Sequence, residues 1–268
     1  MIRARPIRVG LIGFGAIGQA LWTAIAEGRA GDATCPAVLV RRPRAEPDVP
    51  LTANADRFFG ERLDAVVECA GHEAVRQHGE RALTAGADLV VTAVGALVDD
   101  RLRGRLEAAA QTARRRLIIP SAGIGALDML GAAAVGGLSR VRVTVRKDAA
   151  SWKGTAAEMV CDLDALAGPI VLYEGPVREG ARRYPSNVNI SAAAALAGIG
   201  PDRTELRIVA DPGITTHAVE LEAEGAFGSF RFAEDVLPSD ENRKTGRIVA
   251  MGLTKTLRQL SSHLVVGA

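Results

Sequence analysis

The chain has 268 residues, enough apolar material for one large domain or two modest ones. Its formal net charge of +2 and its two Trp and two Tyr argue against a nucleic-acid surface, which needs basic patches and stacking aromatics. The three cysteines show no zinc-ligand spacing, so no metal site is expected. No apolar run reaches membrane-spanning length. We therefore expect a soluble, reduced, cytoplasmic protein.

The first half of the chain alternates short apolar runs with segments of helical periodicity. Strands are predicted at 7–12, 37–40, 65–69, 89–92 and 117–119, and helices at 16–27, 73–85 and 99–113. Strands separated by helices require crossover connections, which produce a parallel sheet covered on both faces. The pattern predicts an α/β fold for this half.

After about residue 122 the rhythm changes. Strands are predicted at 141–146, 170–177, 205–210, 216–224 and 227–232, with an Ala-rich helix at 184–197 and a closing helix at 241–264. Strands that follow one another with little helix between them favour antiparallel pairing. We expect a C-terminal α+β domain over 123–240 with a mostly antiparallel sheet, and a C-terminal segment, 241–268, that packs back on the first domain.

A G-x-G-x-x-G motif lies where the first predicted strand ends and the first helix begins. Gly13 permits the tight turn, Gly15 lets the backbone approach a pyrophosphate, and Gly18 allows close packing of helix on strand. The helix start at Ala16 and Ile17 offers N–H groups and partial positive charge to phosphates. The sequence therefore predicts a Rossmann-type dinucleotide-binding domain over 1–122. The alternative is a tight turn that binds nothing.

The residues after the second strand bear on the choice of cofactor. An acidic residue there would bind ribose hydroxyls and favour NAD, whereas an arginine favours the 2′-phosphate of NADP. The chain has Arg41 and Arg42, which predict NADP or dual use of NADP and NAD; the alternative is a solvated arginine pair.

Other strand ends carry small residues that leave room for a flat cofactor. The candidate contacts are Cys69, Ala70, Ala93, Ser121 and Gly123. Ordinary turn chemistry would explain the same residues. We interpret Cys69 as a small core residue rather than a catalytic thiol.

Several further segments share a pattern with one family. They are 121–128 (SAGIGALD), 146–147 (RK), 184–189 (YPSNVN), 211–212 with 216–217 (DP, TH), and 238–245 with its ENRKT ending. Through these motifs, over nearly the whole chain, the sequence resembles the L-aspartate dehydrogenases. The resemblance implies NAD(P)-dependent oxidation of L-aspartate to iminosuccinate or oxaloacetate, supply of iminosuccinate for NAD biosynthesis, and a homodimer.

The resemblance also implies roles for individual residues. His217 corresponds to the proposed catalytic histidine, and Asn187 to a cofactor contact; Gly123 or Ser121 would contact the nicotinamide half. Asn189, in the same motif as Asn187, is a candidate substrate contact. Independently, His217 suits proton transfer because an unperturbed imidazole has a pKa of about 6.5. Because alternate residues of a strand point to the same side, His217 also lies on the apolar face of its predicted strand. The alternative is therefore a histidine packed in the core.

A dicarboxylate substrate needs cationic partners. The candidates are Lys147, our preferred choice, together with Arg146, Lys153 and Lys244, and with Arg182 and Arg183 as alternatives.

Two departures from the family pattern bear on the substrate. Asp148 and Ala149 stand where relatives have two prolines, and 242–246 reads NRKTG instead of NPKTS. The first departure lies in the expected substrate loop, so a dehydrogenase or imine reductase for a related amino acid remains an alternative. A dinucleotide-binding sensor without turnover is another.

Overall fold

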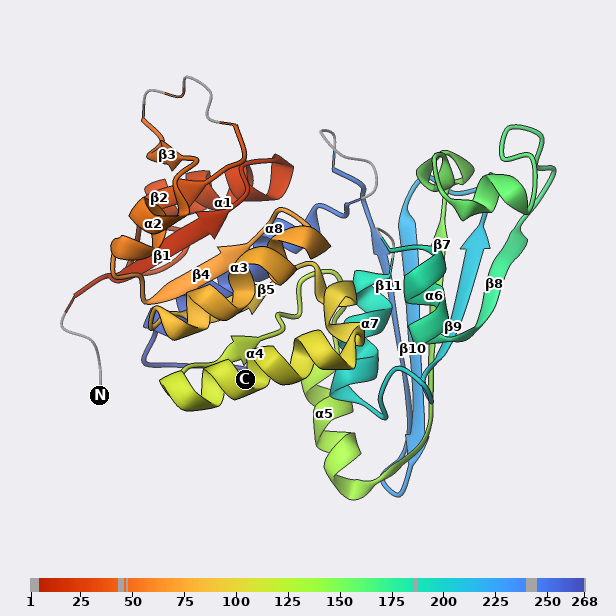
Figure 1. The fold of residues 1–268 in the computed structure, drawn as a ribbon. Coiled ribbons are helices and arrows are strands. Elements are labelled where there is room, and N and C mark those ends of the chain that lie inside the picture. Colours follow the sequence, from red (N-terminus) through yellow and green to blue (C-terminus); the bar gives the residue numbers. More distant parts are fainter. Residues whose placement is uncertain (1–4, 43–45, 47, 186–187, 240–244, 268) are drawn as a thin grey trace. The chain divides into compact units, whose positions relative to one another are not determined.

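The computed structural model describes residues 5–42, 46, 48–185, 188–239 and 245–267. The chain divides into two compact units, the first made of residues 1–122 and 249–268 and the second of 123–248 (Figure 1). Within the described ranges, no helix is both long and apolar enough to cross a membrane.

Unit 1 contains a six-stranded parallel sheet in the order β3-β2-β1-β4-β5-β6. The strands are β1 (Ile7–Ile12), β2 (Ala33–Leu39), β3 (Leu51–Thr52), β4 (Ala65–Glu68), β5 (Asp88–Val91) and β6 (Leu117–Ile118). The helices are α1 (Ala16–Ala26), α2 (Ala55–Gly60), α3 (His72–Thr84) and α4 (Asp100–Ala113), with a 3₁₀ helix, η1 (Val94–Val98). The strand order reverses at β1 and β4, where open α/β sheets bind ligands at the carboxyl ends of their strands. The predicted Rossmann-type sheet is confirmed.

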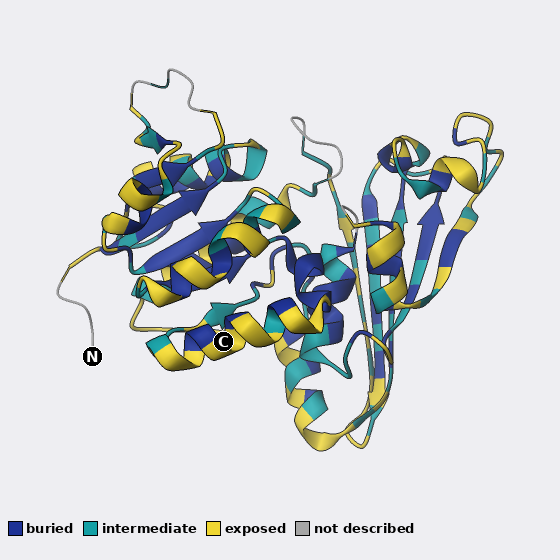
Figure 2. Cartoon of the chain, in the orientation of Figure 1, coloured by how far each residue is buried: buried dark blue, intermediate teal, exposed yellow. Residues whose placement is uncertain are grey.

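The central strands of unit 1 are buried on both faces, as the dark blue ribbon of Figure 2 shows. The C-terminal helix α8 (Ile248–Ser261) adds Leu253 and Leu257 to this core. Gly252 permits the helix to come close, since a Cβ there would lie 2.7 Å from the carbonyl oxygen of Ser121. The described part of the helix starts at Ile248, and Gly246 before it forms an isolated bridge with Pro238; the predicted start at 241 lies outside the described residues.

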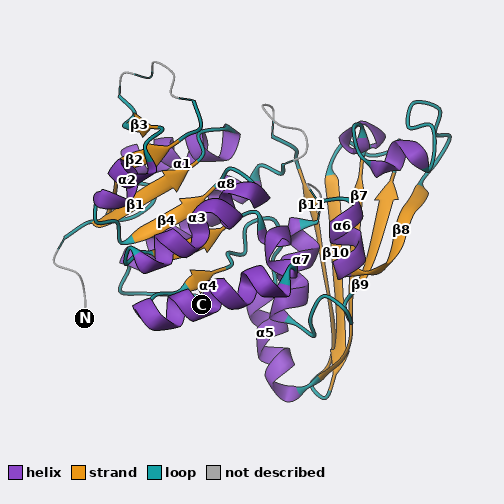
Figure 3. Cartoon of the chain, viewed as in Figure 1, coloured by secondary structure: helices purple, strands orange, loops and turns teal. Residues whose placement is uncertain are grey.

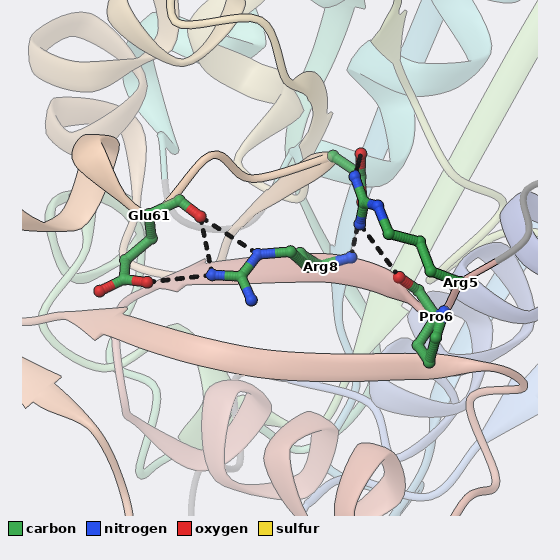
Figure 4. A network of polar contacts seen from close by, with 5 residues as sticks. Arg5, Pro6, Arg8 and Glu61 are labelled. Atoms are coloured by element: carbon green, nitrogen blue, oxygen red, sulfur yellow. Dashed lines mark hydrogen bonds and ion pairs between the residues drawn. The ribbon is translucent and has the colours of Figure 1, made fainter.

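A polar network fixes the amino-terminal edge of the same sheet (Figure 4). The guanidinium of Arg8, on β1, donates to the backbone carbonyl of Glu61 at 2.8 Å and to its carboxylate at 3.0 Å. Arg5 binds both carboxylate oxygens of Asp64 at 2.8 and 3.0 Å. Since these groups are partly exposed, they contribute little stability each, and they lie at the end of the sheet opposite to the strand carboxyl ends.

Unit 2 contains a five-stranded sheet in the order β11-β10-β7-β9-β8 (Figure 3). The strands are β7 (Leu138–Lys147), β8 (Ile170–Pro176), β9 (Glu205–Ala210), β10 (His217–Gly225) and β11 (Gly228–Val236). Only β7 and β9 pair in parallel, so the predicted mostly antiparallel sheet is confirmed. The helices are α5 (Leu127–Gly136), α6 (Val177–Arg183) and α7 (Asn189–Ala197), with 3₁₀ helices η2 (Ala149–Trp152) and η3 (Ala156–Met159).

The helix predicted at 184–197 is wrong in its first part. Helix α6 ends at Arg183 and α7 begins only at Asn189, with Pro185 between them. A proline disfavours helical backbone in the residue before it and lacks an N–H to continue a helix. The break leaves the start of α7 as a separate element beside the sheet.

Candidate functional site

The glycine turn of unit 1 has a shape that only glycine satisfies at two of its three positions. Gly13 has φ of +100°, and a Cβ there would lie 2.9 Å from the Cβ of Ala70. A Cβ at Gly18 would lie 2.4 Å from the carbonyl oxygen of Gly13. At Gly15, by contrast, an added Cβ meets no atom within 4 Å. The turn is therefore closely packed at Gly13 and Gly18 and open at Gly15, where the backbone must come close to a pyrophosphate.

Helix α1 begins at this turn and leaves its amino terminus available to an anion. Gly15 is the N-cap residue and provides no side-chain cap, and the first turn, from Ala16, contains no acidic residue. The N–H groups of a first helical turn have no partner within the helix and carry partial positive charge. These features fit the pyrophosphate of a dinucleotide.

Glu68, which was not among the predicted site residues, connects two of the strand ends that carry small residues. It is 1% exposed at the end of β4, and one carboxylate oxygen accepts the N–H groups of Ala70 at 2.7 Å and Gly71 at 2.6 Å. The other accepts the N–H of Ala93 at 3.0 Å. The acidic residue closing an otherwise apolar strand was the available signal. Burial raises the pKa of the Glu68 carboxyl, while these N–H donors act to lower it.

Cys69 follows Glu68 and is partly buried. Burial, and next the negative charge of Glu68, raise the pKa of its thiol well above the ordinary value. A thiol that stays protonated is a poor nucleophile, which supports the interpretation of Cys69 as a small packing residue.

The two arginines expected at the adenosine ribose follow β2, which ends at Leu39. Arg41 and Arg42 are both exposed, and neither guanidinium makes an ion pair or hydrogen bond within the described part of the chain. Ser121 is also exposed and follows β6 in unit 1, whereas Gly123 is the first residue of unit 2.

In unit 2, His217 is the first residue of β10 and is 3% exposed, on the buried face shared by Val219 and Leu221. Across one ladder it pairs with Val236 of β11. Across the other, Ala218 pairs with Arg146, and the antiparallel register places the next residues, His217 and Lys147, opposite each other.

Lys147 is the last residue of β7 rather than a loop residue, and it is 3% exposed. Its Nζ lies 5.7 Å from the centre of the Trp152 ring. A buried ammonium is costly unless anionic or polar groups compensate it. Lys147 therefore places a positive charge in the buried part of unit 2, next to His217.

The departure from the family pattern at Asp148 has a local structural explanation. Asp148 is 8% exposed and caps η2, accepting the N–H of Ser151 at 3.1 Å and its hydroxyl at 2.7 Å. The capped turn carries Trp152, which is 0% exposed and meets the ring of Tyr184 edge to face at 5.8 Å. Trp152 was not among the predicted site residues, although it lies five residues after Lys147 of the matched Arg146–Lys147 motif.

Four of the other predicted substrate cations lie within the described residues, and none of them is paired with His217 in the β10 ladders. Arg146 points to the opposite face of β7 from Lys147 and forms an ion pair with Asp211 at 3.4 Å. Lys153 forms an ion pair with Asp164 at 2.5 Å, and half of its side chain is exposed. Arg182 is exposed and Arg183 pairs with Glu179.

Of the three remaining predicted residues, Asn187, Asn189 and Lys244, the structure describes one. Asn189 is the first residue of α7 and is partly buried. Asn187 and Lys244 lie outside the described residues.

Among the described histidines, His217 is the buried one. His72 begins α3, and His263 is exposed near the C-terminus. Burial, and next the charge of Arg81, lower the pKa of His78 on the same helix. The described ranges also contain no cluster of three or more His, Cys, Asp or Glu side chains that could hold a metal ion.

Glu234 adds a second titratable group to the His217 face. It pairs with Val219 across the β10–β11 ladder, one step along the face from His217. Its carboxyl accepts a hydrogen bond from the N–H of Gly125, and burial raises its pKa to about 7. Glu234 was not predicted as a site residue, since a glutamate on an edge strand suggests a solvent-facing position.

Comparisons with known proteins agree with this division of the chain. Residues 13–120 match the family model described as homoserine dehydrogenase, NAD binding domain. Residues 128–260 match the model described as aspartate dehydrogenase, C-terminal.

Curated relatives extend the similarity. The chain is 46% identical over 204 residues to an L-aspartate dehydrogenase of Pseudomonas aeruginosa, covering 76% of this chain and 75% of the relative. It is 39% identical over 263 residues to one of Ralstonia nicotianae, covering 94% and 96%. The solved structure of aspartate dehydrogenase from Thermotoga maritima has a TM-score of 0.78 at 24% identity, covering 97% of this chain and 99% of that one, which shows a shared fold.

Proposed function

The chain belongs to the L-aspartate dehydrogenase family, and we propose that it catalyses the NAD(P)-dependent oxidation of L-aspartate. The substrate loses a hydride from Cα and a proton from nitrogen to give iminosuccinate, which water converts to oxaloacetate and ammonia; the reverse is reductive amination. The observation that carries the proposal is the buried pair His217 and Lys147 in a chain whose other unit has a glycine turn suited to a dinucleotide.

Unit 1 supplies the residues that would hold the cofactor. Gly13, Gly15 and Gly18, with the N–H groups of Ala16 and Ile17, would bind the pyrophosphate. A nicotinamide dinucleotide, when bound, supplies the hydride acceptor.

Further cofactor contacts are proposed on the strand ends and on the family motif. They are Cys69, Ala70, Ala93, Ser121, Gly123 and Asn187. The hydrogen bonds of Glu68 support the first three, because they fix the backbone of both strand ends.

Unit 2 supplies proton transfer and substrate binding. We assign His217 the proton that leaves the substrate ammonium, because imidazole gains and loses a proton near neutral pH. Lys147 would neutralise a substrate carboxylate, and Asn189 and Lys244 would contribute further contacts. A base and a cation held on adjacent strands meet the need for precise orientation.

A panel of substrates tests the reaction. L-aspartate with NAD(P)+, and oxaloacetate with ammonia and NAD(P)H, should each change the absorbance of the reduced cofactor. Turnover of a related amino acid but not of aspartate would favour the alternative substrate, and cofactor binding without any turnover would favour the sensor. The hydrogen bonds of Asp148 support aspartate as the substrate. They give this residue, which differs from the family pattern, a role in the structure of the loop.

The cofactor preference is a separate proposal. The exposed Arg41 after β2 supports NADP or dual use, because its guanidinium can pair with a 2′-phosphate. Arg41→Ala should raise the KM for NADPH and leave that for NADH unchanged, whereas the exposed Arg101→Ala on α4 should change neither. A strong preference of the unmodified enzyme for NADH would refute NADP use.

Two further properties, the homodimer and the supply of iminosuccinate, rest on the family resemblance, and a cytoplasmic location rests on the number and spacing of the cysteines. We propose a homodimer, a cytoplasmic location and supply of iminosuccinate to NAD biosynthesis. Light scattering of the purified chain measures the first, cell fractionation the second, and rescue of a strain unable to make iminosuccinate the third.

A further inference from the structure

The side chain of Trp152 buries a hydrogen-bond donor that the fold itself does not use. The residue is 0% exposed, and its indole Nε1 has no hydrogen-bond partner within the described part of the chain. Native proteins pair nearly all buried donors, because an unpaired one loses its bond to water without replacement. An unused donor at this depth therefore calls for an explanation.

The position of the indole is fixed from several sides. Asp148 caps the turn that carries it, the carbonyl of Trp152 accepts the hydroxyl of Thr155 at 2.6 Å, and the ring packs edge to face on Tyr184. These contacts use the ring and the backbone. A phenylalanine could make similar ones, so they do not account for the N–H.

The surroundings of the indole favour an anion. The Lys147 ammonium lies 5.7 Å from the ring centre and is itself 3% exposed, opposite His217 on the same sheet face. An indole N–H donates but cannot accept, and a bond from it to a carboxylate is charge-assisted. The low local dielectric would strengthen both the hydrogen bond from the indole and the attraction of the carboxylate to Lys147.

We propose that Trp152 is a specificity-determining residue, and that its Nε1 donates to the substrate carboxylate that Lys147 neutralises. The inference rests on the proposed function, since it concerns the same dicarboxylate site. Because Nε1 is buried, a carboxylate reaches it only as neighbouring side chains rearrange, which would change the environment of the indole.

Kinetics of Trp152→Phe test the donor. The substitution keeps an aromatic ring and removes the N–H. We expect the KM for L-aspartate to rise about tenfold, with the KM for the cofactor and the melting temperature close to those of the wild type. A role in packing alone would lower the melting temperature and leave the KM for aspartate unchanged.

Fluorescence gives a readout that does not depend on turnover. The chain has two tryptophans, so Trp22→Phe leaves Trp152 as the sole reporter. Succinate, a dicarboxylate without an amino group to oxidise, should shift or quench the Trp152 emission, and acetate at equal ionic strength should not. In Trp152→Phe, where Trp22 on α1 remains, succinate should have no effect.

The outcomes separate this inference from the proposed function. If the wild type oxidises aspartate but Trp152→Phe has an unchanged KM and succinate leaves the Trp152 emission unaltered, the inference is wrong and the function stands. If the wild type does not oxidise aspartate, the function is wrong, and a succinate response of Trp152 would still support a dicarboxylate subsite.

Discussion

His217 and Lys147 follow the last pair of the β7–β10 ladder, Ala218 and Arg146, so the antiparallel register places them opposite each other, and both side chains are buried. Directly opposed residues of antiparallel strands have Cβ atoms about 4.5–5.5 Å apart. The proposed proton-transfer group and a cation are thus held together by strand pairing rather than by a loop. A slip of one residue in this register would move a whole strand's side chains to the other face.

Replacing His217 tests the proton-transfer role. His217→Asn should lower kcat with L-aspartate by roughly 10²–10⁴-fold, the usual contribution of a positioned acid–base group. Cofactor affinity, measured by fluorescence titration, should stay unchanged because the glycine turn belongs to the other unit. His263→Asn, at an exposed position, is the matched control. Turnover near that of the wild type would remove His217 from the chemistry.

Replacing Lys147 tests the substrate cation. Lys147→Met keeps much of the aliphatic length but removes the charge, and should raise the KM for L-aspartate about 10- to 100-fold, the value of a hydrogen bond to a charged group. Lys153→Met is the control, since Lys153 is half exposed and paired with Asp164. Equal KM values for the two variants would contradict the assignment.

Glu68 is expected to position the cofactor-facing backbone. Its carboxylate accepts N–H donors from both strand ends, whereas a glutamine has a single acceptor oxygen and an NH₂ that cannot accept. Glu68→Gln should therefore raise the KM for the cofactor about tenfold and leave the KM for aspartate nearly unchanged. Glu73→Gln, on the exposed side of α3, is the control. A folded Glu68→Gln enzyme with a normal cofactor KM would show that the carboxylate is not needed for positioning.

Glu234 should make stability depend on pH. Its folded pKa of about 7 exceeds the ordinary value of 4.5, so the folded state favours the protonated carboxyl. The stabilisation is complete below pH 4.5 and is lost as the pH rises through 7. Because the group is only about half buried, we expect on the order of 1 kcal/mol.

Urea unfolding at pH 5 and pH 8 measures this effect. The wild type should lose stability relative to Glu234→Gln between the two pH values. The wild type should lose no stability relative to Asp235→Asn, a substitution on the exposed face of the same strand, between these pH values. A stability difference between wild type and Glu234→Gln that is the same at both pH values would exclude the titration of Glu234.

Local patterns predicted much of the fold. The bounds of β1 and β9 match the predicted strands, and the glycine turn lies where the motif placed it, because apolar periodicity and backbone sterics act over a few residues. Predictions failed where a short-range signal was misread. The alanine-rich pattern placed the start of a helix at Tyr184, but the helix begins at Asn189, after Pro185, and the preceding helix α6 was not predicted.

By itself, the sequence determined the dinucleotide turn, the two-domain order and the parity that puts His217 on an apolar face, since each depends on neighbouring residues. The tertiary structure alone decided that Lys147 stands opposite His217, that Glu68 joins two strand ends, and that the Trp152 donor is buried beside a cation. These relationships connect segments distant in the chain. The register and packing between elements set them, and no local periodicity contains that information.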